Sequence, residues 1–458
     1  MEENGEPSDR LATALAMAIC ALCVGHAIDI RRGFYSPSAL AWLSIGGLVC
    51  VVAVTLPRIA EVELLCGRLL RPTLAAAAAL QAAIVVRGTW PAPSIAGLTA
   101  LIAVLGLAQI FDLRALRVPL ITLMLVAFCL AGTLAFRLYS PDPNIDVFRF
   151  QQGGAQALLR GANPYTVKIA NPFGPGTPVY GPGIVDRNDR LTVGPPYPPL
   201  SLLMVLPAYG WGGDCRYAHV AAVAISAALM TAARPGLPGA LAAVLFLLTP
   251  QVFYVINTSW TEPLLTLTFS LVMFCACRWR PGLPWVLGLF FATKQYGVLA
   301  VPLLGLLLVE RDRSSRLLPS LAKAGAVVAA LNVPFLLWNP GEFFRAVVEF
   351  QFMQPFRHDA LSYLVWVYYN YGGYEPPMWA LLLTLSVAVG AALAMALRGC
   401  ARTPAGFAAA MTLVGLAFFA FNKQAFCNYY YFVIATACWA VAAIRMPEVT
   451  YSRAEGVT

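Results

Sequence analysis

Two aspartates beside a long apolar segment are the residues of this chain whose type and position best suit chemistry. Asp142 and Asp146 lie in Pro141-Asp142-Pro143-Asn144-Ile145-Asp146, which follows the apolar run 117–139. A carboxylate next to a membrane-spanning helix is costly, so acidic residues at such a place mark a functional site. We expect the site to begin here, with Asp146 as the first candidate and Asp142, locked between two prolines, as the weaker one.

The residues after Asp146 predict an interfacial helix and then a rigid loop. Polar side chains recur at positions 149, 152, 156 and 160, which is helical spacing with an apolar opposite face. Gly161 and Asn163-Pro164 end this helix. Eleven of the chain's 34 prolines fall in 141–199, and proline lowers the entropy of a loop that must hold one shape. The alternative, that Asp146 is only a helix N-cap, leaves this stiffened loop without a purpose.

A lysine interrupts an apolar run further along the chain. Lys294 lies within the run 283–308, with no acidic residue nearby in sequence. A lysine inside a membrane span normally has a partner or faces a cavity, and we favour a substrate-facing role over snorkelling to the membrane surface.

Two later stretches combine cationic and hydrogen-bonding side chains. Arg357 precedes His358, one of only three histidines in the chain, and Lys423 precedes Gln424. Arginine can hold phosphate oxygens bidentately, and the alternative partners of an arginine at a membrane edge are lipid head groups. His358 can instead make an ordinary surface hydrogen bond. The tyrosines at 429–431 that follow Lys423 can also belong to an interfacial aromatic belt.

Composition indicates a polytopic membrane protein. Of 458 residues, 59% are hydrophobic and 12% are charged, about half the charged fraction of a soluble domain. The net charge of +9 comes from basic residues in short loops beside apolar spans, as the positive-inside rule predicts, so nucleic acid is excluded as a partner. The eleven cysteines lie mostly within apolar runs and are expected to be structural, and we predict no metal site.

Hydropathy predicts an all-α fold of about 12–14 transmembrane helices, with interfacial helices in the outer loops. The basic loops place the N-terminus inside, and the 140–197 and 339–376 loops together outside. Arg278 and Arg280 conflict with this scheme unless 284–309 is broken near Lys294, or 199–213 is re-entrant. The candidate spans are 11–30, 37–56, 69–87, 93–111, 117–139, 199–213, 217–233, 238–256, 262–278, 284–309, 320–338, 377–397, 405–421 and 429–444.

The order of these motifs resembles the GT-C membrane glycosyltransferases. An Asp after an outward-going helix precedes Leu158-Leu159-Arg160-Gly161-Ala162-Asn163-Pro164-Tyr165, and Tyr197-Pro198-Pro199-Leu200 then opens the next helix. The sequence is most similar to the polyprenyl-phosphate-mannose-dependent mannosyltransferases of glycosyltransferase family 87. The resemblance covers 117–444. It leaves an N-terminal bundle of about four spans, 1–116, apart from the site, and a cytoplasmic tail, 445–458.

The resemblance implies roles for the candidate residues. Asp146 is the matching catalytic base, and His358 takes part in the site from the late outer loop. Four side chains are expected to bind the donor phosphate: Arg357, Lys294, Lys423 and Gln424. Five residues are expected to bind the acceptor or to shape the loop: Asp142, Arg149, Asn163, Tyr165 and Tyr197.

The implied reaction moves a sugar, with mannose as the default, from a polyprenyl-phosphate donor to a glycan, glycolipid or protein acceptor at the outer face of a bacterial cell membrane. One base suits an inverting displacement, whereas a retaining route needs a second carboxylate about 5 Å away. No cofactor is implied, and a divalent cation is left open. A lipid-sugar transporter or flippase and a non-catalytic envelope-assembly scaffold are the competing functions.

Overall fold

The computed structural model describes residues 9–87, 92–111, 114–308 and 317–446. The described residues form helices and three isolated β-bridges, with no strand. The α-helices are α1 Leu11–Ile30, α2 Pro37–Thr55, α3 Ala60–Arg87, α4 Pro93–Leu107, α5 Arg117–Tyr139, α6 Asp146–Leu159, α7 Pro199–Gly212, α8 Arg216–Ala233, α9 Leu237–Leu247, α10 Val252–Asn257, α11 Glu262–Arg278, α12 Leu283–Thr293, α13 Leu304–Leu308, α14 Leu317–Trp338, α15 Pro340–Phe344, α16 Phe350–Met353, α17 Tyr363–Asn370, α18 Met378–Gly399, α19 Pro404–Ala420 and α20 Cys427–Ala442.

Within the described ranges, eight helices are long and apolar enough to cross a membrane: α1, α2, α3, α4 with the short helix after it, α5, α8, α14 and α18. The other predicted spans also fold as helices, but shorter ones. A rise of about 1.5 Å per residue makes a helix of 11 to 17 residues too short to cross alone. These shorter helices, such as α9, α19 and α20, pack inside the bundle, where their side chains are mostly buried.

Two of the predicted spans are broken. The 238–256 span divides into α9 and α10 at Gln251, whose backbone adopts a left-handed conformation with φ 66°. The 284–309 span divides at Lys294 into α12 and a 3-10 helix, η5 Gln295–Leu303, followed by α13. The break at Lys294 is one of the two solutions that the sequence offered for the conflict at Arg278.

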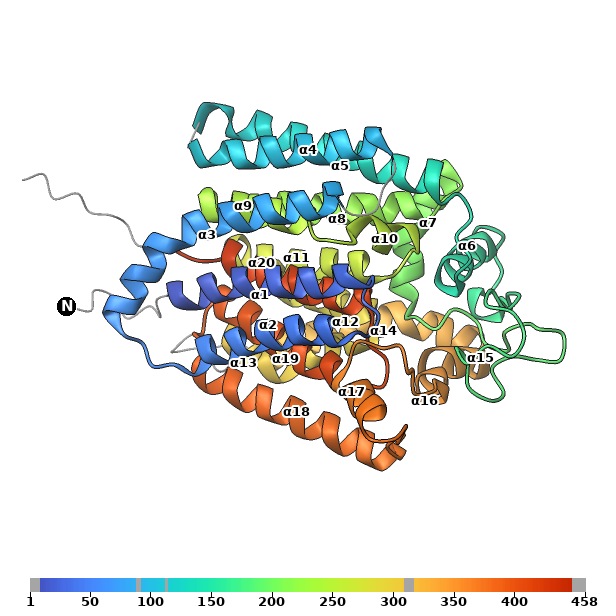
Figure 1. Cartoon of the computed structure of the whole chain (residues 1–458). Helices are drawn as coiled ribbons and strands as arrows, with labels where there is room; N and C mark the ends of the chain where they lie inside the picture. Colours follow the sequence, from blue (N-terminus) through green and yellow to red (C-terminus); the bar gives the residue numbers. More distant parts are fainter. Residues whose placement is uncertain (1–8, 88–91, 112–113, 309–316, 447–458) are drawn as a thin grey trace, which may run out of the picture.

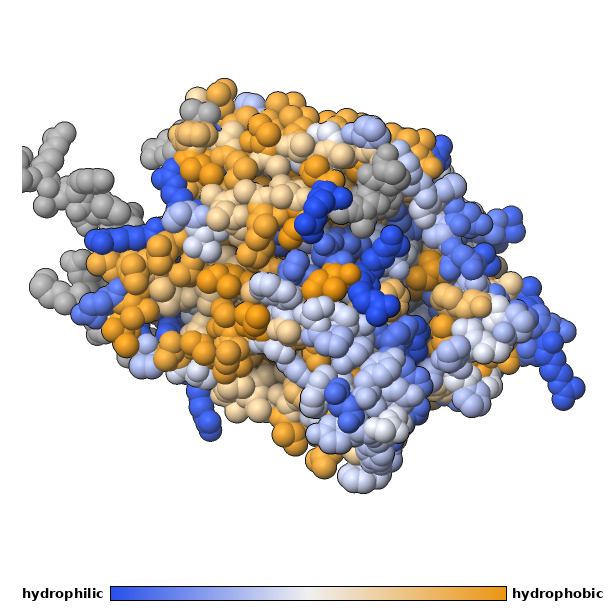
Figure 2. Space-filling model, viewed as in Figure 1, coloured by the Kyte–Doolittle hydropathy of each residue, from blue (hydrophilic) through white to orange (hydrophobic). Residues whose placement is uncertain are grey.

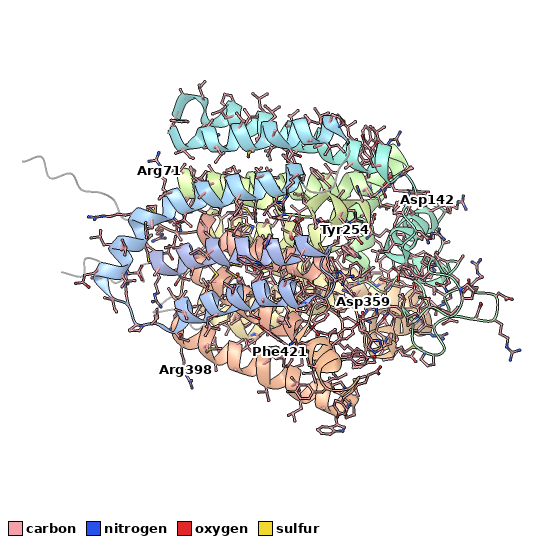
Figure 3. All side chains as sticks on the ribbon, in the orientation of Figure 1. Arg71, Asp142, Tyr254, Asp359, Arg398 and Phe421 are labelled. Atoms are coloured by element: carbon pink, nitrogen blue, oxygen red, sulfur yellow. The ribbon has the colours of Figure 1, made fainter. Side chains whose placement is uncertain are left out.

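The two ends of the bundle carry different charged residues and loops. Arg71 and Arg398 lie at one end, whereas Asp142 and Asp359 lie at the opposite end (Figure 3). The 140–197 and 339–376 segments therefore share one end of the bundle, as their predicted common sidedness requires (Figure 1). Arg278 donates to the carbonyl of Ala232 in the last turn of α8. Helix α8 runs back toward the end of the bundle that carries Arg71. The predicted basic loop of Arg311, Arg313 and Arg316 and most of the predicted tail lie outside the described residues.

Helix α7 does not cross the bundle, which corrects the span predicted at 199–213. The carbonyl of Tyr197 before α7 accepts a hydrogen bond from Tyr165, and that of Gly213 after it accepts one from Gln152. Both ends of α7 thus contact the segment containing α6, and α7 packs alongside α6. This is the re-entrant alternative that the sequence left open.

Short amphipathic helices cover the end of the bundle that carries these loops. They are α6 from the 140–197 segment and α15, α16 and α17 from the 339–376 segment (Figure 1). Figure 2 shows that hydrophilic residues gather at this end, whereas the surface over the long helices is largely apolar. The helix predicted after Asp146 is confirmed as α6, with its apolar residues Val147, Phe148 and Phe150 buried.

The first helices belong to the same core as the rest of the chain. Helix α1 packs against α2, α3 and α20, and its buried side chains join one continuous apolar cluster with those of α19 and α20. The loop between α1 and α2 fits closely because Gly33, with φ 78°, lies against the backbone of Cys427. This differs from the expectation that the first spans lie apart from the site.

Replacing Gly33 by alanine is expected to lower the apparent melting temperature of the purified protein in detergent. A Cβ at this position would lie 2.3 Å from the Cys427 nitrogen. Its left-handed backbone adds a cost of about 1 kcal/mol for any L side chain. The control is Gly47→Ala in α2, where an added Cβ meets nothing within 4 Å. An unchanged melting temperature for Gly33→Ala would contradict this close packing.

Candidate active site

A cavity of about 980 Å³ opens at the loop-covered end of the bundle. Its walls come from the α1–α2 loop, the 140–197 segment, α10, the Lys294 break, the 339–376 segment, α18, and the turn between α19 and α20. The polar and charged residues that line it include Asp146, Tyr180, Tyr197, Lys294, Gln295, Gln351, Gln354, Arg357, Asn422, Lys423, Gln424 and Tyr429.

Asp146 is half-buried at the first position of α6 and lines this cavity. Its Oδ2 accepts a hydrogen bond from the Tyr180 hydroxyl at 2.8 Å, and its Oδ1 accepts one from the Val147 N–H at 2.8 Å. Burial raises the pKa of the Asp146 carboxyl, while the hydrogen bonds from Tyr180 and Val147 and the charge of Arg357 lower it in part. The result is a carboxyl group with a raised pKa, as suits a proton acceptor near neutral pH.

A buried arginine holds the segment that leads into Asp146. Arg216, at the start of α8, binds the Asp214 carboxylate through Nε and Nη2, the latter at 2.7 Å. Its remaining donors bind the carbonyls of Ser140 and Pro141, where the chain leaves α5. The guanidinium lies 4.6 Å from the ring centroids of both Phe136 and Phe148, so α5 and α6 are joined through one cation.

A second buried network holds the middle of α6. Gln151 donates to the carbonyl of Ser259 at 2.6 Å and pairs with His219 Nε2 at 2.8 Å. Ser259 follows α10 and adopts a left-handed backbone conformation with φ 56°. The helix that carries Asp146 is therefore fixed to the bundle by side chains on its inner face.

Lys294 forms a buried ion pair that its sequence neighbours did not reveal. Its Nζ binds Oε1 of Glu262, the first residue of α11, and the Tyr296 hydroxyl donates to the same oxygen at 3.0 Å. The Lys294 Nζ also lies 5.1 to 5.5 Å from the ring centroids of Tyr296, Tyr429 and Tyr197. The cation is thus held between a fully buried carboxylate and three aromatic rings at the wall of the cavity.

Glutamine side chains tie the two outer segments together at the cavity. Gln295 donates to the carbonyls of Pro196 at 3.1 Å and Val347 at 3.0 Å. Gln351 donates to the same Pro196 carbonyl at 3.2 Å. These contacts fix the backbone immediately before Tyr197, whose ring lines the cavity.

Asn163 and Tyr165 shape the loop from behind and do not line the cavity. The Asn163 side chain caps the short helix Pro164–Thr166 by accepting from the Tyr165 N–H at 2.9 Å. The Tyr165 ring is buried against Phe335 and Phe343, and its hydroxyl donates to the Tyr197 carbonyl at 2.8 Å. Of the two roles that the sequence left open for this pair, the contacts favour loop shaping.

The late polar stretches form a wall of the cavity with two cationic side chains, Arg357 and Lys423. Arg357 makes a bidentate pair with Asp359, at 2.9 and 2.8 Å, and donates its backbone N–H to the Lys423 carbonyl. Lys423 binds the carbonyl of Gln354 at 2.5 Å, and burial lowers the pKa of its amine. Gln424 donates to the side chain of Gln354 and to the Pro355 carbonyl. Lys423 and Gln424 therefore hold the segment of Arg357 while also lining the cavity.

Besides Asn163 and Tyr165, three predicted site residues do not line the cavity. His358 is partly exposed, stacks on Tyr368 with ring centroids 4.3 Å apart, and binds Glu375 at 2.6 Å. It lies in a turn, whereas the neighbouring Arg357 lines the cavity. Asp142 is exposed at the outer edge (Figure 3), and Arg149 binds the Asn144 side chain. His358 is not among the residues that line the cavity, and its part in the site stays a prediction.

Sequence reasoning did not assign Tyr180, Glu262 and Arg32 to the site. Tyr180 lies in the proline-rich loop, and its contact with Asp146 spans 34 residues. Glu262 carried a usable signal, because an acid at the start of an apolar helix is a natural partner for a lysine inside another. Arg32 lines the cavity from the α1–α2 loop, which the sequence set apart.

The cavity continues from its polar chamber into an apolar arm. The arm is bounded by side chains of η5, α18 and α19, including Leu299, Leu382 and Phe418. Val298 and Leu382 also have exposed fractions of 60% and 51%, so the arm reaches the outer surface of the helices. A long hydrocarbon chain could enter it from the side.

Replacing Arg216 by methionine is expected to destabilise the protein by about 3–5 kcal/mol, because the buried Asp214 carboxylate would lose its partner. The double variant Asp214→Asn with Arg216→Met should recover part of this loss, since it leaves no unpaired charge. Thermal unfolding in detergent checks both. Equal melting temperatures for the single variant and the parent protein would show that the pair does not hold the segment before Asp146.

No family model and no curated protein matches this chain. Among solved structures, the chain is similar to the crystal structure of ArnT from Cupriavidus metallidurans bound to undecaprenyl phosphate, with 18% sequence identity and a TM-score of 0.45. The match covers 72% of this chain and about 60% of the length of that structure. A likeness at this level does not show a family, so function has to follow from the residues of the cavity.

Proposed function

We propose that this chain is a multi-pass membrane glycosyltransferase that moves a sugar from a polyprenyl-phosphate donor to a hydroxyl acceptor. The observation that carries the proposal is one cavity with the Asp146 carboxylate on one wall, cationic side chains on another and an apolar arm that reaches the surface of the helices. A base, a phosphate-binding wall and a groove for a lipid chain are the three parts that such a transfer requires.

Asp146 is the proposed general base. It takes the proton of the acceptor hydroxyl as the acceptor oxygen bonds to the anomeric carbon of the donor sugar. The bond from that carbon to the phosphate oxygen breaks, and its electron pair leaves with the polyprenyl phosphate. Asp146 is the only acidic residue among the described residues that line the cavity, which favours an inverting displacement, because a retaining one needs a second carboxylate about 5 Å away.

Arg357 and Lys423 are the proposed binding groups for the phosphate. They lie on adjoining segments that are joined by a backbone hydrogen bond, and both line the cavity. The Asp359 carboxylate orients the Arg357 guanidinium, which can present parallel donors to phosphate oxygens. Lys294 is already paired with Glu262, so its proposed role is to add positive potential near the phosphate and to hold the ring of Tyr429 toward the sugar. Gln424 supports this wall through Gln354.

The polyprenyl chain of the donor is proposed to lie in the apolar arm between η5, α18 and α19. Mannose is the proposed sugar on the basis of the family resemblance, and a glycan, glycolipid or protein carries the acceptor hydroxyl. The loop-covered end is proposed to face the outside of a bacterial cell membrane, since the basic loops lie at the other end.

A lipid-sugar transporter is the second candidate. It is favoured by the charged pair of Lys294 and Glu262 at a helix break, because transporters place polar groups at broken helices within the membrane. Uptake of the lipid-linked sugar by proteoliposomes without release of polyprenyl phosphate would support it. A scaffold without chemistry would show neither uptake nor release.

The first test incubates the purified protein with several polyprenyl-phosphate sugars and a mixture of acceptors, and measures released polyprenyl phosphate. Asp146→Asn is expected to lower the rate by at least about 100-fold, because the amide cannot accept the acceptor proton. The melting temperature should change little, since asparagine keeps the shape of the side chain. Asp142→Asn is the control and should retain activity. Full activity of Asp146→Asn would remove the proposed base.

The rate is expected to fall at low pH as Asp146 takes up a proton, with a midpoint above the ordinary pKa of an aspartate. Tyr180→Phe removes a hydrogen bond that stabilises the carboxylate, so the pKa of Asp146 should rise further. A hydrogen bond to a charged group is worth about 1.5 kcal/mol, which corresponds to about one pH unit. The acid limb of the pH–rate profile should therefore shift about one unit to higher pH. Tyr374→Phe, at an exposed tyrosine outside the cavity, should leave the limb in place. A shift to lower pH, or none, would contradict the role of Tyr180.

A further inference from the structure

A second group of residues lines the same cavity and comes from elements other than η5, α18 and α19. We call it the second arm, and its members are Arg32, Phe34, Tyr139, Phe173, Tyr254 and Trp260. In Figure 3, Tyr254 of this arm lies above Asp359, and Phe421 near the apolar arm lies below it and to the left. Two substrates could thus approach the polar chamber from different directions.

Arg32 is the cation of the second arm. Among the residues that the structure describes, no acidic side chain forms an ion pair with it. Its guanidinium carbon lies 5.6 Å from the ring centroid of Tyr254. The carboxylate of Asp29, three positions earlier, instead accepts a hydrogen bond from Gln251 at 2.9 Å. The guanidinium therefore keeps its capacity to bind an anion, and Arg32 is an exposed residue that lines the cavity.

The backbone around Arg32 is fixed to the rest of the site. Arg32 adopts a left-handed conformation with φ 54°, which an L residue keeps only where its surroundings impose it. The next residue, Gly33, lies against Cys427, Phe34 forms a β-bridge with Ala360, and the Tyr35 N–H donates to the Asp359 carbonyl at 2.9 Å. The α1–α2 loop is thus attached to the segment that carries Arg357.

We propose that the second arm binds the phosphate of an amphiphilic molecule, with Arg32 as the anion-binding residue. That this molecule is the acceptor rests on the proposed function, in which the donor occupies the apolar arm and the Arg357 wall. The aromatic rings of Phe34, Tyr254 and Trp260 line the same arm, so a ligand with both an anionic head and an apolar body fits it better than a free ion. Arginine suits phosphate because its planar donors bind two oxygens at once.

The binding test needs no turnover. Dioctanoyl phosphatidic acid, dioctanoyl phosphatidylcholine and inorganic phosphate are titrated in turn into the purified full-length protein, and binding is followed by native mass spectrometry. Arg32→Ala should weaken phosphatidic acid binding about tenfold, and Arg32→Lys should recover part of it. Arg31→Ala is the matched control, because Arg31 is an adjacent exposed arginine outside the cavity lining, and should change binding less than about twofold.

Equal binding of phosphatidylcholine would overturn the proposal, as would inorganic phosphate binding as tightly as the lipid, or equal effects of the Arg31 and Arg32 variants. Asp146→Asn should leave phosphatidic acid binding intact. If no donor sugar is turned over but lipid binding still depends on Arg32, the proposed function fails and the binding site stands. If transfer occurs and Arg32→Ala leaves both lipid binding and the KM for a phosphorylated acceptor unchanged, the site fails and the function stands.

Discussion

The buried ion pair of Lys294 and Glu262 is the interaction on which the geometry of the cavity depends. A single charge inside an apolar bundle is costly, and a pair is tolerated only where its geometry and hydrogen bonds are good. Here the pair joins Lys294, at the break between α12 and η5, to Glu262, the first residue of α11. Because the chain turns at Lys294, Gln295 can reach the carbonyls of Pro196 and Val347, so one pair fixes both outer segments over the bundle.

The cost of burying a charge also governs how the Asp146 carboxylate is held at the cavity. Burial raises the pKa of Asp146 and so disfavours its charged form. The Tyr180 hydroxyl and the Arg357 charge oppose that shift from two other segments. The proline-rich loop and the Arg357 wall therefore both favour the charged carboxylate, which links the rigidity of these loops to the proposed chemistry.

Periodicity and hydropathy were enough to predict the all-helical fold, the interfacial helix of Asp146, the break at Lys294 as one alternative, and the shared end of the two long loops. They could not supply partners that are distant in sequence, such as Glu262 for Lys294 or Tyr180 for Asp146. They also treated His358 and Arg357 as neighbours in function, whereas Arg357 lines the cavity and His358, in the turn that follows, does not. The direction of a side chain and the identity of its partner depend on tertiary packing, which local sequence patterns do not specify.

The packing of the first helices shows what composition alone cannot predict in a membrane protein. Lipid tails are as apolar as leucine, so composition does not tell whether an apolar helix packs against lipid or against its own bundle. The informative features are small residues that permit close approach, such as Gly33 against Cys427 and Gly46 against Cys23. Those contacts bring Arg32 to the cavity from a segment with few polar residues of its own. In this chain the site is therefore assembled by packing between distant helices, and a boundary drawn from composition at residue 116 separates side chains that share one cavity.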